Sequence, residues 1–318
     1  MNSTRKKFTL IASGMIVIGI LLTAIGFFAG AKLSIVNTED GFQALGNHDR
    51  KAEEFSLTEF ANIEGDLQDT DIEIIPSNEY KLKIERLAGT KVTHKITNDT
   101  LVLKESDHEP LWQIDLNFGT LTKKVVKIYV PKEVTFGNIS LKNRFGDVRL
   151  DGMKVERLTI HSSEGDLTLN DIQSNQLTIE NKFGDMNANN VITEDLNVEM
   201  HDGDAKFDSV RANSTVFQNE FGDLNFLNFT SEALTIQSKD GDIEIQGMLL
   251  GNSVIHSNFG DTKLQLLNKE SNLSYNIHND FGDITVNNNR FEKNASHTTN
   301  SQHKLDITST DGDVHVTF

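Results

Sequence analysis

The chain has 318 residues and a formal net charge of −17, with 37% hydrophobic residues, 7% aromatic residues, three prolines and no cysteine. This length fits one or two domains. Asn, Thr, Asp and Gly are abundant and β-branched residues fill many apolar positions, which disfavours a helical bundle. The absence of cysteine excludes disulfides, thiolate zinc sites, a lipidated cysteine and a Cys nucleophile.

The first 31 residues combine a basic start with an apolar run. Arg5, Lys6 and Lys7 precede an uncharged stretch, residues 8–31, which as a helix would extend about 36 Å and cross a ~30 Å hydrocarbon core. We therefore expect an uncleaved transmembrane anchor, with the N-terminus in the cytoplasm and residues 32–318 outside the cell. Cleavage after Ala31 stays open, because Ala29-Gly30-Ala31 is typical of a signal-peptide site.

Residues 32–318 carry the acidic charge of the chain. Residues 1–31 contribute +3, so the remainder has a formal charge of −20. Such a surface argues against binding to nucleic acid and against docking on anionic lipid. We therefore expect no nucleic-acid partner.

A short phrase that ends in Gly-Asp recurs through the second half of the chain. Seven of its glycines follow one another at intervals of 19 residues, and two more follow after 22 and 30 residues. A short fixed period predicts stacked coils, each of which buries its face on the next. The glycines, which we expect at the coil corners, are Gly146, Gly165, Gly184, Gly203, Gly222, Gly241, Gly260, Gly282 and Gly312.

Apolar residues recur at fixed distances from each glycine, at positions +2, +4, +7, +12 and +14. This pattern predicts two short strands per coil, at +1 to +5 and +11 to +16, joined by loops of about six residues. Because similar side chains recur at each position, we expect an all-β fold, a parallel β-solenoid, with a right-handed wind preferred. Tyr275, Ile277, Leu305 and Ile307 keep the register beyond Gly260, so the longer intervals are expected to hold loop insertions.

These patterns divide the chain into four parts. We expect an N-terminus and anchor at 1–31, a polar juxtamembrane linker at 32–57, an N-terminal β capping region at 58–135 and the solenoid at 136–318. The far end of the solenoid shows no obvious cap, and the chain stops inside a strand at Phe318. That edge is expected to be free to pair.

An aspartate follows every corner glycine. The structural interpretation is that each carboxylate accepts hydrogen bonds from turn amides. The alternative is a calcium ladder, because hard cations prefer carboxylate oxygens. The calcium candidates are Asp166, Asp185, Asp202, Asp204, Asp223, Asp240, Asp242 and Asp261.

The residue before each corner glycine alternates between Phe and an acid. The series reads Phe145, Glu164, Phe183, Asp202, Phe221, Asp240, Phe259. We expect each Phe ring to pack into the corner of every second coil. The alternative is an aromatic strip that binds sugar or peptide.

Catalysis is not indicated. Carboxylate pairs such as Asp202 with Asp204 recur in every second coil, whereas an active site is a single exceptional place. The sequence holds no Gly-x-Ser-x-Gly, His-Glu-x-x-His or P-loop motif. His161, His201, His256 and His278 fall at mostly outward positions without ligand spacing. We expect no catalytic or cofactor-binding residues.

A basic N-terminus, one apolar span, the strand "KIYVPK" and the Gly-Asp repeats together resemble the bacterial putative-adhesin β-strand-repeat family. That family includes LiaG-like membrane-anchored proteins of low-GC Gram-positive bacteria, and the resemblance is firmest over residues 124–318. It implies a β-solenoid at the cell envelope, without established catalytic residues, and some relatives are linked to envelope-stress responses.

We expect a single-pass protein of the cell membrane that acts as a non-enzymatic adhesion, scaffolding or sensing module of the cell envelope. Its expected partner is an envelope component or a membrane protein. Two alternatives stay open. One is a polysaccharide-active β-helix enzyme, and the other is a surface scaffold that polymerises through the edge at Phe318.

Overall fold

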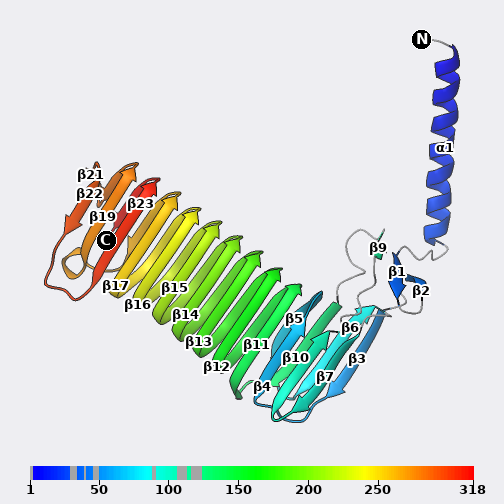
Figure 1. Ribbon diagram of the computed structural model, residues 1–318, viewed down its shortest axis with the longest axis horizontal. Helices are drawn as coiled ribbons and strands as arrows, with labels where there is room; N and C mark the ends of the chain where they lie inside the picture. Colours follow the sequence, from blue (N-terminus) through cyan, green and yellow to red (C-terminus); the bar gives the residue numbers. More distant parts are fainter. Residues whose placement is uncertain are drawn as a thin grey trace. The chain divides into compact units, whose positions relative to one another are not determined.

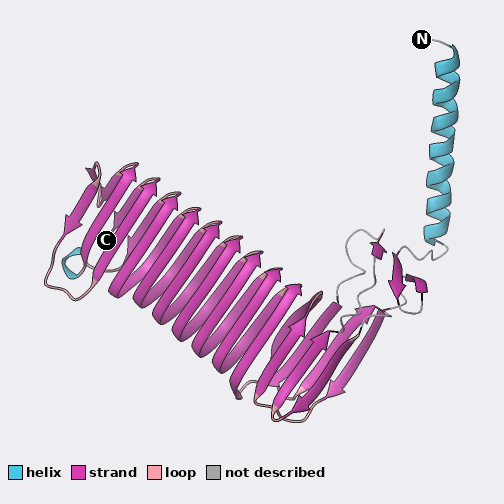
Figure 2. Cartoon of the chain, viewed as in Figure 1, coloured by secondary structure: helices cyan, strands magenta, loops and turns pink. Residues whose placement is uncertain are grey.

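The computed structural model describes residues 3–28, 34–38, 41–45, 50–87, 91–105, 113–115 and 124–318. The chain divides into two compact units. The first comprises Met1–Ala52, Glu85–Lys91 and Ser106–Lys123, and the second comprises Glu53–Ile84, Val92–Glu105 and Lys124–Phe318. The described part of the second unit is almost entirely β-strand (Figure 2).

The first unit contains helix α1 (Ser3–Phe28) and a small antiparallel sheet. In this sheet β1 (Ser34–Thr38) lies between β2 (Gly41–Leu45) and β9 (Gln113–Asp115). Residues 34–56 therefore hold strands, including β3 (Arg50–Ser56), where the sequence predicted a polar linker.

The transmembrane helix expected at residues 8–31 is not confirmed. Within the described part of the chain, no helix combines the length and the apolar character that membrane crossing requires. Helix α1 nevertheless exposes many large apolar side chains between Ile11 and Ile25. These residues are Ile11, Met15, Ile16, Val17, Ile18, Ile20, Leu21, Leu22 and Ile25.

The second unit is built on a regular row of parallel strands (Figure 1). Each central strand is 17 residues long, and residues 19 positions apart pair along most of its length, as in Leu158 with Leu177. A register shift leaves Phe229, Thr230 and Ser231 paired with the residues 18 positions later. The parallel solenoid is therefore confirmed. The strands of the row are β11 (Thr135–Phe145), β12 (Val148–Glu164), β13 (Leu167–Phe183), β14 (Met186–Asp202), β15 (Ala205–Phe221), β16 (Leu224–Asp240), β17 (Ile243–Phe259) and β18 (Thr262–Leu266).

The core follows the predicted apolar positions and adds two further columns. Positions +2, +4, +12 and +14 are buried along the row, and +7 is buried in β12 to β16, as the burial of Val148, Leu150 and Met153 illustrates. In β17 a register shift buries Leu249 in place of Met248. Positions +9 and +16 are buried as well, although many of their side chains are small or polar. The sequence pattern missed them because buried Ser, Thr and Asn are hydrogen-bonded across coils, as Ser174 is to Thr193 at 2.9 Å.

The strands bend without interrupting the ladder, so the predicted loops of about six residues are wrong. The residue at position +6 adopts a positive φ in five successive coils, from Gly152 to Asn228. Gly, Asn and Asp tolerate this left-handed conformation better than other residues do. The residue at +6 makes one of the bends of each coil, and the backbone hydrogen bonds continue on both sides of it. These five residues are Gly152, Asp171, Asn190, Ser209 and Asn228.

At the C-terminal end, the order of coils in space differs from their order in the chain. Strand β23 (Lys304–Asp311) lies between β17 and β19 (Ser274–Phe281) (Figure 1). Strand β24 (Val314–Thr317) likewise pairs with β18 on one side and with β20 (Ile284–Val286) on the other. The coil of Gly312 is therefore inserted between those of Gly260 and Gly282. The predicted register is confirmed, since Leu305 pairs with Tyr275.

The insertion before β23 forms a cap and is more than a loop. Strand β21 (Asn289–Phe291) pairs antiparallel with β20, and β22 (Asn294–His297) pairs antiparallel with β19. A short 3-10 helix, η2 (Glu270–Asn272), precedes β19. Phe318 is half-buried against the core, and its backbone N–H donates to Asn287 Oδ1 at 3.0 Å. The expected free edge at Phe318 is therefore wrong, and with it the structural basis of the polymerising scaffold.

The N-terminal end of the row is interleaved in the same way. Strand β4 (Asn62–Leu67) lies between β11 and β8 (Thr100–Glu105), and β5 (Thr70–Ser77) pairs with both β12 and β10 (Lys124–Pro131). Strand β7 (Val92–Thr97) closes this end antiparallel to β8, and β6 (Lys81–Leu87) pairs with β10 and β3. An antiparallel strand at each end blunts an edge that would otherwise pair with another chain.

Candidate binding ridge

The Gly-Asp phrase forms the sharp corner of each coil. At Gly203 the φ angle is +132°, and a Cβ atom there would lie 2.2 Å from the carbonyl oxygen of Gly184 in the neighbouring coil. Successive corners stack at the same close distance. Glycine is therefore required for two independent reasons, the backbone conformation and the approach of the next coil.

The aspartates of the corner form a continuous hydrogen-bonded ladder. Oδ1 of each Asp accepts the backbone N–H of the Asp in the next coil, as Asp204 Oδ1 does from Asp223 at 2.9 Å. The ladder crosses the interleaved coil too, since Asp313 N–H donates to Asp261 Oδ1 at 2.8 Å. The structural interpretation of the column is confirmed, because the carboxylates accept bonds from corner amides. Its members are Asp71, Asp147, Asp166, Asp185, Asp204, Asp223, Asp242, Asp261, Asp313 and Asp283.

The calcium interpretation of this column rests on the sequence alone. Within the described ranges, no group of three or more His, Cys, Asp or Glu residues is arranged to hold a metal ion. Of the eight candidates, Asp202 and Asp240 lie outside the ladder, one residue before a corner glycine.

Removing calcium is expected to leave the thermal stability unchanged. The amide-to-carboxylate bonds of the ladder hold without a cation, and a ligand stabilises a fold only when it binds the native state. Differential scanning calorimetry in excess calcium and in excess chelator checks this expectation. A Tm that rises by several degrees with calcium, and does not rise with an equal concentration of magnesium, would contradict it.

Buried asparagines support the corners of Gly146, Gly184 and Gly222 from inside. The side-chain amides of Asn181 and Asn219 donate to the carbonyl oxygens of Gly184 and Gly222 at 2.8 and 2.7 Å. Asn143 makes the same bond to Gly146. These asparagines occur in coils whose corner begins with Phe, so the alternation over two coils, or 2 × 19 = 38 residues, extends into the core.

The Phe residues before the corner glycines point outward. Phe183, Phe221 and Phe259 are 53%, 51% and 53% exposed, and Phe145 and Phe281 are 43% and 68% exposed. The prediction that these rings pack into the corner is therefore wrong. In the coils that carry Phe, the corner interior is already filled by the buried Asn or Ser three residues before the glycine. The exposed arrangement is the alternative that the sequence left open, an aromatic strip.

The strip alternates strictly between aromatic and acidic residues. In-register pairing places Asp202 between Phe183 and Phe221, and Asp240 between Phe221 and Phe259. The interleaved coil continues this order, because Asp311 pairs with both Phe259 and Phe281. We name this row the Phe–acid ridge, and its members are Phe145, Glu164, Phe183, Asp202, Phe221, Asp240, Phe259, Asp311 and Phe281.

Phe281 and Asp311 were missed by the sequence analysis, although the sequence contains a signal for them. If an acid must follow Phe259 in space, the next coil has to be the one that begins with Asp311, and the coil of Phe281 has to come after it. Alternation along the ridge thus encodes the inserted position of β23.

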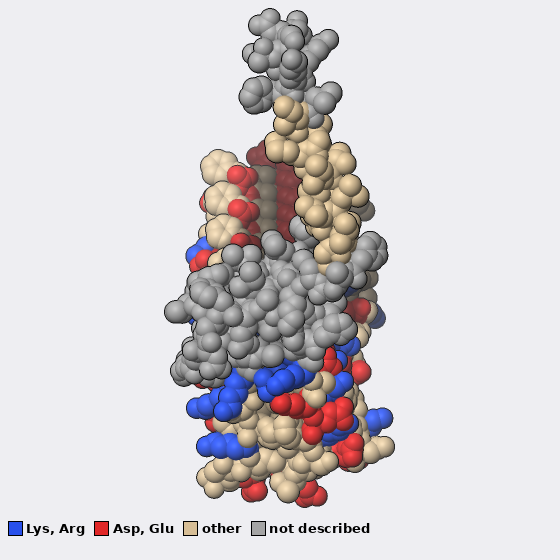
Figure 3. All heavy atoms as spheres, turned by 90° about the vertical axis from the view of Figure 1, so that its right-hand side faces the viewer, with Lys and Arg blue, Asp and Glu red and all other residues tan. Residues whose placement is uncertain are grey.

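The ridge carboxylates are exposed and have no cationic partner. Glu164, Asp202, Asp240 and Asp311 form no ion pair within the residues that the structure describes. Residues 136–318 contain 28 Asp and Glu against 14 Lys and Arg. Figure 3 shows acidic side chains gathered into stacked columns in the upper part of the view. An exposed carboxylate that lies next to a Phe ring attracts a group that is both cationic and partly apolar.

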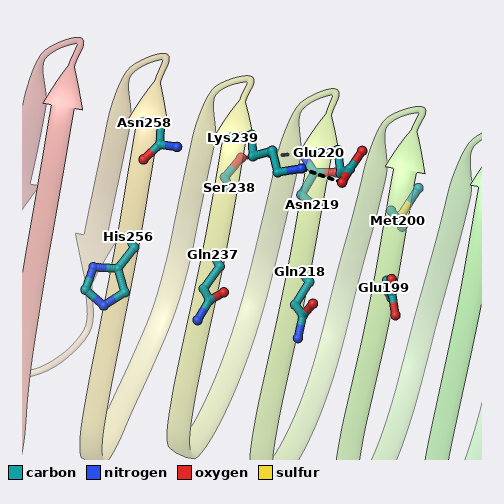
Figure 4. Close-up of a pocket in the computed structure, with 10 residues that line it drawn as sticks. All are labelled: Glu199, Met200, Gln218, Asn219, Glu220, Gln237, Ser238, Lys239, His256 and Asn258. Atoms are coloured by element: carbon teal, nitrogen blue, oxygen red, sulfur yellow. Dashed lines mark hydrogen bonds and ion pairs between the residues drawn. The ribbon is translucent and has the colours of Figure 1, made fainter.

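A shallow groove of about 300 Å³ runs beside the ridge. It is lined by residues that lie one, two or three places before ridge residues, among them Gln218, Gln237 and His256 (Figure 4). Its charges are already paired, since Glu220 contacts both Lys239 and His201. Glu220 therefore has its pKa lowered, first by the hydrogen bond from Lys239 and then by that from His201.

The predicted surface histidines lie on this face as expected. His161 Nδ1 lies 3.0 Å from Glu180 Oε2, and His278 Nε2 lies 3.2 Å from Asp280 Oδ1. His161, His201 and His256 share one repeat face but belong to different coils, and within the described residues no three His, Asp or Glu side chains there are arranged to hold a metal ion. The described surface therefore offers repeated, equivalent positions for binding.

A buried ion pair secures the N-terminal end of the row. Lys124 Nζ lies 2.6 Å from Glu105 Oε1, and their side chains are only 9% and 3% exposed. Oε2 of Glu105 also accepts the backbone N–H groups of Gln68 and Asp69. Burial by itself raises the pKa of Glu105, but the bonds from Lys124 and from these two amides outweigh it, so the pKa lies below its usual value.

Comparison with protein families gives a match over most of the chain. Residues 60–317 match the model of the Toastrack DUF4097 family. The chain belongs to this family. The resemblance to a putative-adhesin β-repeat family that the sequence indicated is thereby confirmed. No curated protein shows significant similarity to this Toastrack chain.

Several solved structures of bacterial proteins are similar to this chain. A putative adhesin of Bacteroides fragilis is 15% identical, with 85% of this chain and 97% of that chain covered and a TM-score of 0.38. A putative lipid binding protein of Parabacteroides distasonis is 12% identical, with 85% and 98% covered and a TM-score of 0.46. A putative adhesin of the same species is 11% identical, with 83% and 96% covered and a TM-score of 0.47.

Proposed function

We propose that this Toastrack protein is a non-enzymatic binding module of the bacterial cell envelope, and that the Phe–acid ridge is its binding surface. The observation that carries the proposal is the exposure of Phe183, Phe221 and Phe259 in one straight row. Contiguous exposed apolar groups on a soluble surface mark interaction sites. Nothing in the fold needs these rings outside, because the corner is closed by Gly, Asp and Asn.

A row of equivalent sites suits avidity. Each Phe with its flanking acids offers one weak contact, and several contacts on a rigid support combine into firm binding of a long or repetitive partner. The competing function, a polysaccharide-active enzyme, requires one singular carboxylate pair in a groove. The groove beside the ridge has its Glu220 carboxylate engaged by Lys239 and His201, which favours binding over hydrolysis.

The envelope location is part of the proposal. The basic residues before α1, together with the exposed apolar side chains from Ile11 to Ile25, support attachment to the cytoplasmic membrane with the ridge outside. A role in envelope-stress responses is a further proposal, which rests on the family resemblance. Proteolysis of intact cells checks the location, because an externally added protease should remove a C-terminal epitope tag without lysis.

Changing the three central rings is expected to weaken binding to the cell wall about 10-fold or more. The change is Phe183→Ser, Phe221→Ser and Phe259→Ser together, and each ring removes apolar contact area from the interface. The measurement is co-sedimentation of the purified full chain, in detergent, with cell-wall fragments from the bacterium that produces it.

The matched control replaces exposed apolar side chains away from the ridge. Ile192→Ser and Leu267→Ser together remove groups that are 49% and 67% exposed, and they should leave sedimentation unchanged. Equal sedimentation of the ridge variant and the wild type would refute the assignment of the ridge. Release of soluble saccharides during the incubation would support the enzymatic alternative instead.

A further inference from the structure

The Phe–acid ridge has a repeat length that selects among partner conformations. Neighbouring coils lie about 4.8 Å apart, so successive Phe residues on every second coil lie about 9.6 Å apart. The same distance separates successive carboxylates, which occupy the coils between. A linear partner that lies along the ridge must present equivalent groups at this interval.

Only one regular polypeptide conformation repeats at this length. A polyproline II helix has three residues per turn and rises 3.1 Å per residue, so one face recurs every 9.3 Å or so. Over the four steps from Phe145 to Phe281 the accumulated mismatch is only about 1.2 Å. An extended β-strand repeats each face at about 6.7 Å. An α-helix repeats after seven residues, at about 10.5 Å, and falls out of step by about 3.6 Å over the same distance.

We propose that the ridge binds a cationic polypeptide segment in the polyproline II conformation, with one residue of every three against a Phe ring and a Lys or Arg near each carboxylate. This inference rests on the proposed function of the ridge as a binding surface and names its partner. Aromatic side chains are the usual platforms for such helices, because the preformed helix loses little conformational entropy when it docks.

The charge of the ridge fixes the charge of the partner. Glu164, Asp202 and Asp240 are exposed and unpaired among the described residues. Each lies midway between two Phe rings, about 1.4 Å along the axis from the nearest residue that does not contact a ring. A lysine at that position reaches the carboxylate and also the faces of the neighbouring rings. Acidic and neutral segments lack this contact.

The groove beside the ridge supplies hydrogen-bond donors on two adjacent coils, which lie about 4.8 Å apart. A polyproline II chain leaves its carbonyl oxygens without internal partners. Gln218 and Gln237 lie on adjacent coils and line the groove side by side (Figure 4). Their amide groups can donate to those carbonyl oxygens and keep the bound segment in register.

The test uses the purified full chain in detergent and synthetic peptides with a fluorescent label. The peptide (Pro-Pro-Lys)5 carries five charges at a period of three residues, in step with the ridge. The peptide (Pro-Pro-Pro-Lys)5 has the same conformation and charge at a period of four, and (Pro-Pro-Glu)5 reverses the charge. Fluorescence anisotropy should show that the first binds about 10-fold more tightly than the second, and that the third does not bind. Binding should weaken as salt is raised.

Protein variants separate specific recognition from attraction to any acidic surface. Glu164→Gln, Asp202→Asn and Asp240→Asn together neutralise the ridge and should weaken the first peptide about 10-fold or more. The matched control neutralises three exposed carboxylates that lie elsewhere on every second coil, by Glu156→Gln, Glu194→Gln and Glu232→Gln. With the same change in net charge, the control should lose less than about 3-fold. Circular dichroism confirms that each variant is folded.

Three results would overturn the inference. The first is equal affinity for the period-three and period-four peptides, and the second is equal loss in the ridge and control variants. The third is ridge-dependent binding of glucosamine oligomers without binding of the period-three peptide, which would assign the ridge to a polysaccharide. If cell-wall sedimentation depends on the ridge but no peptide binds, this inference fails alone. If the peptide binds and the cell wall does not, the proposed function fails.

Discussion

Replacing Gly203 with alanine is expected to destabilise the second unit by at least about 3 kcal/mol. The new Cβ would lie 2.2 Å from the carbonyl oxygen of Gly184, an atom of the rigid backbone that cannot move aside. The residue would also hold a φ of +132°, which side chains of L-amino acids rarely adopt. Urea unfolding followed by circular dichroism measures the loss.

The matched control lies six residues further along the same coil. Ser209 also has a positive φ, of 58°, in a conformation that Gly152 adopts in another coil. Ser209→Gly should therefore change the free energy of unfolding by less than about 1 kcal/mol. If Gly203→Ala cost no more than this control, the close stacking of the corners would be wrong.

Replacing Lys124 with methionine is expected to cost about 3–5 kcal/mol, because it leaves the Glu105 carboxylate buried without its cation. The carboxylate would keep the backbone bonds from Gln68 and Asp69, but these do not neutralise its charge. Lys127→Met is the control, since the pair of Lys127 with Glu73 has side chains that are 27% and 28% exposed. That substitution should cost less than about 1 kcal/mol.

The cost of Lys124→Met is expected to depend on pH. In the wild type the pKa of Glu105 is lowered from its ordinary 4.5, so the unfolded state takes up the proton more readily. The stability from this group is therefore complete above pH 4.5 and is lost as the pH falls through the lower, folded value. The difference between wild type and variant should shrink between pH 6 and pH 3. A constant difference would show that lost packing, and not charge, is the cause.

The sequence by itself determined the repeating part of the fold. A period of 19 residues sets which residues meet, since each side chain packs on its equivalent in the next coil, and Leu158 on Leu177 is typical. The apolar positions therefore located the core, and the Gly-Asp phrase located the corners. Aspartate after each glycine was correctly interpreted as an acceptor of corner amides, because that bond also joins equivalent residues.

The exposure of the Phe rings was decided by the tertiary structure. The local sequence pattern shows that an apolar residue stands at the corner, but it does not show whether its side chain points into the core or toward solvent. That side depends on the buried Asn or Ser two places earlier, which alternates with it across the strand and occupies the interior. Two bends per coil, at +5 and +6 and at +10 and +11, likewise shift the alternation of buried and exposed residues, which the period alone does not reveal.

Only the tertiary structure placed the coils at the two ends. The coil of Gly282 and that of Gly312 present the same apolar pattern to a neighbour, so either one satisfies the exposed face of β17 and β18. The choice is made by contacts distant in the chain, such as Asp313 with Asp261 and Phe318 with Asn287. A repeat specifies which faces stack. The order in which the coils stack is set by the strand pairing at the two ends. That pairing covers both end strands, and it keeps Phe and acidic residues alternating along the ridge.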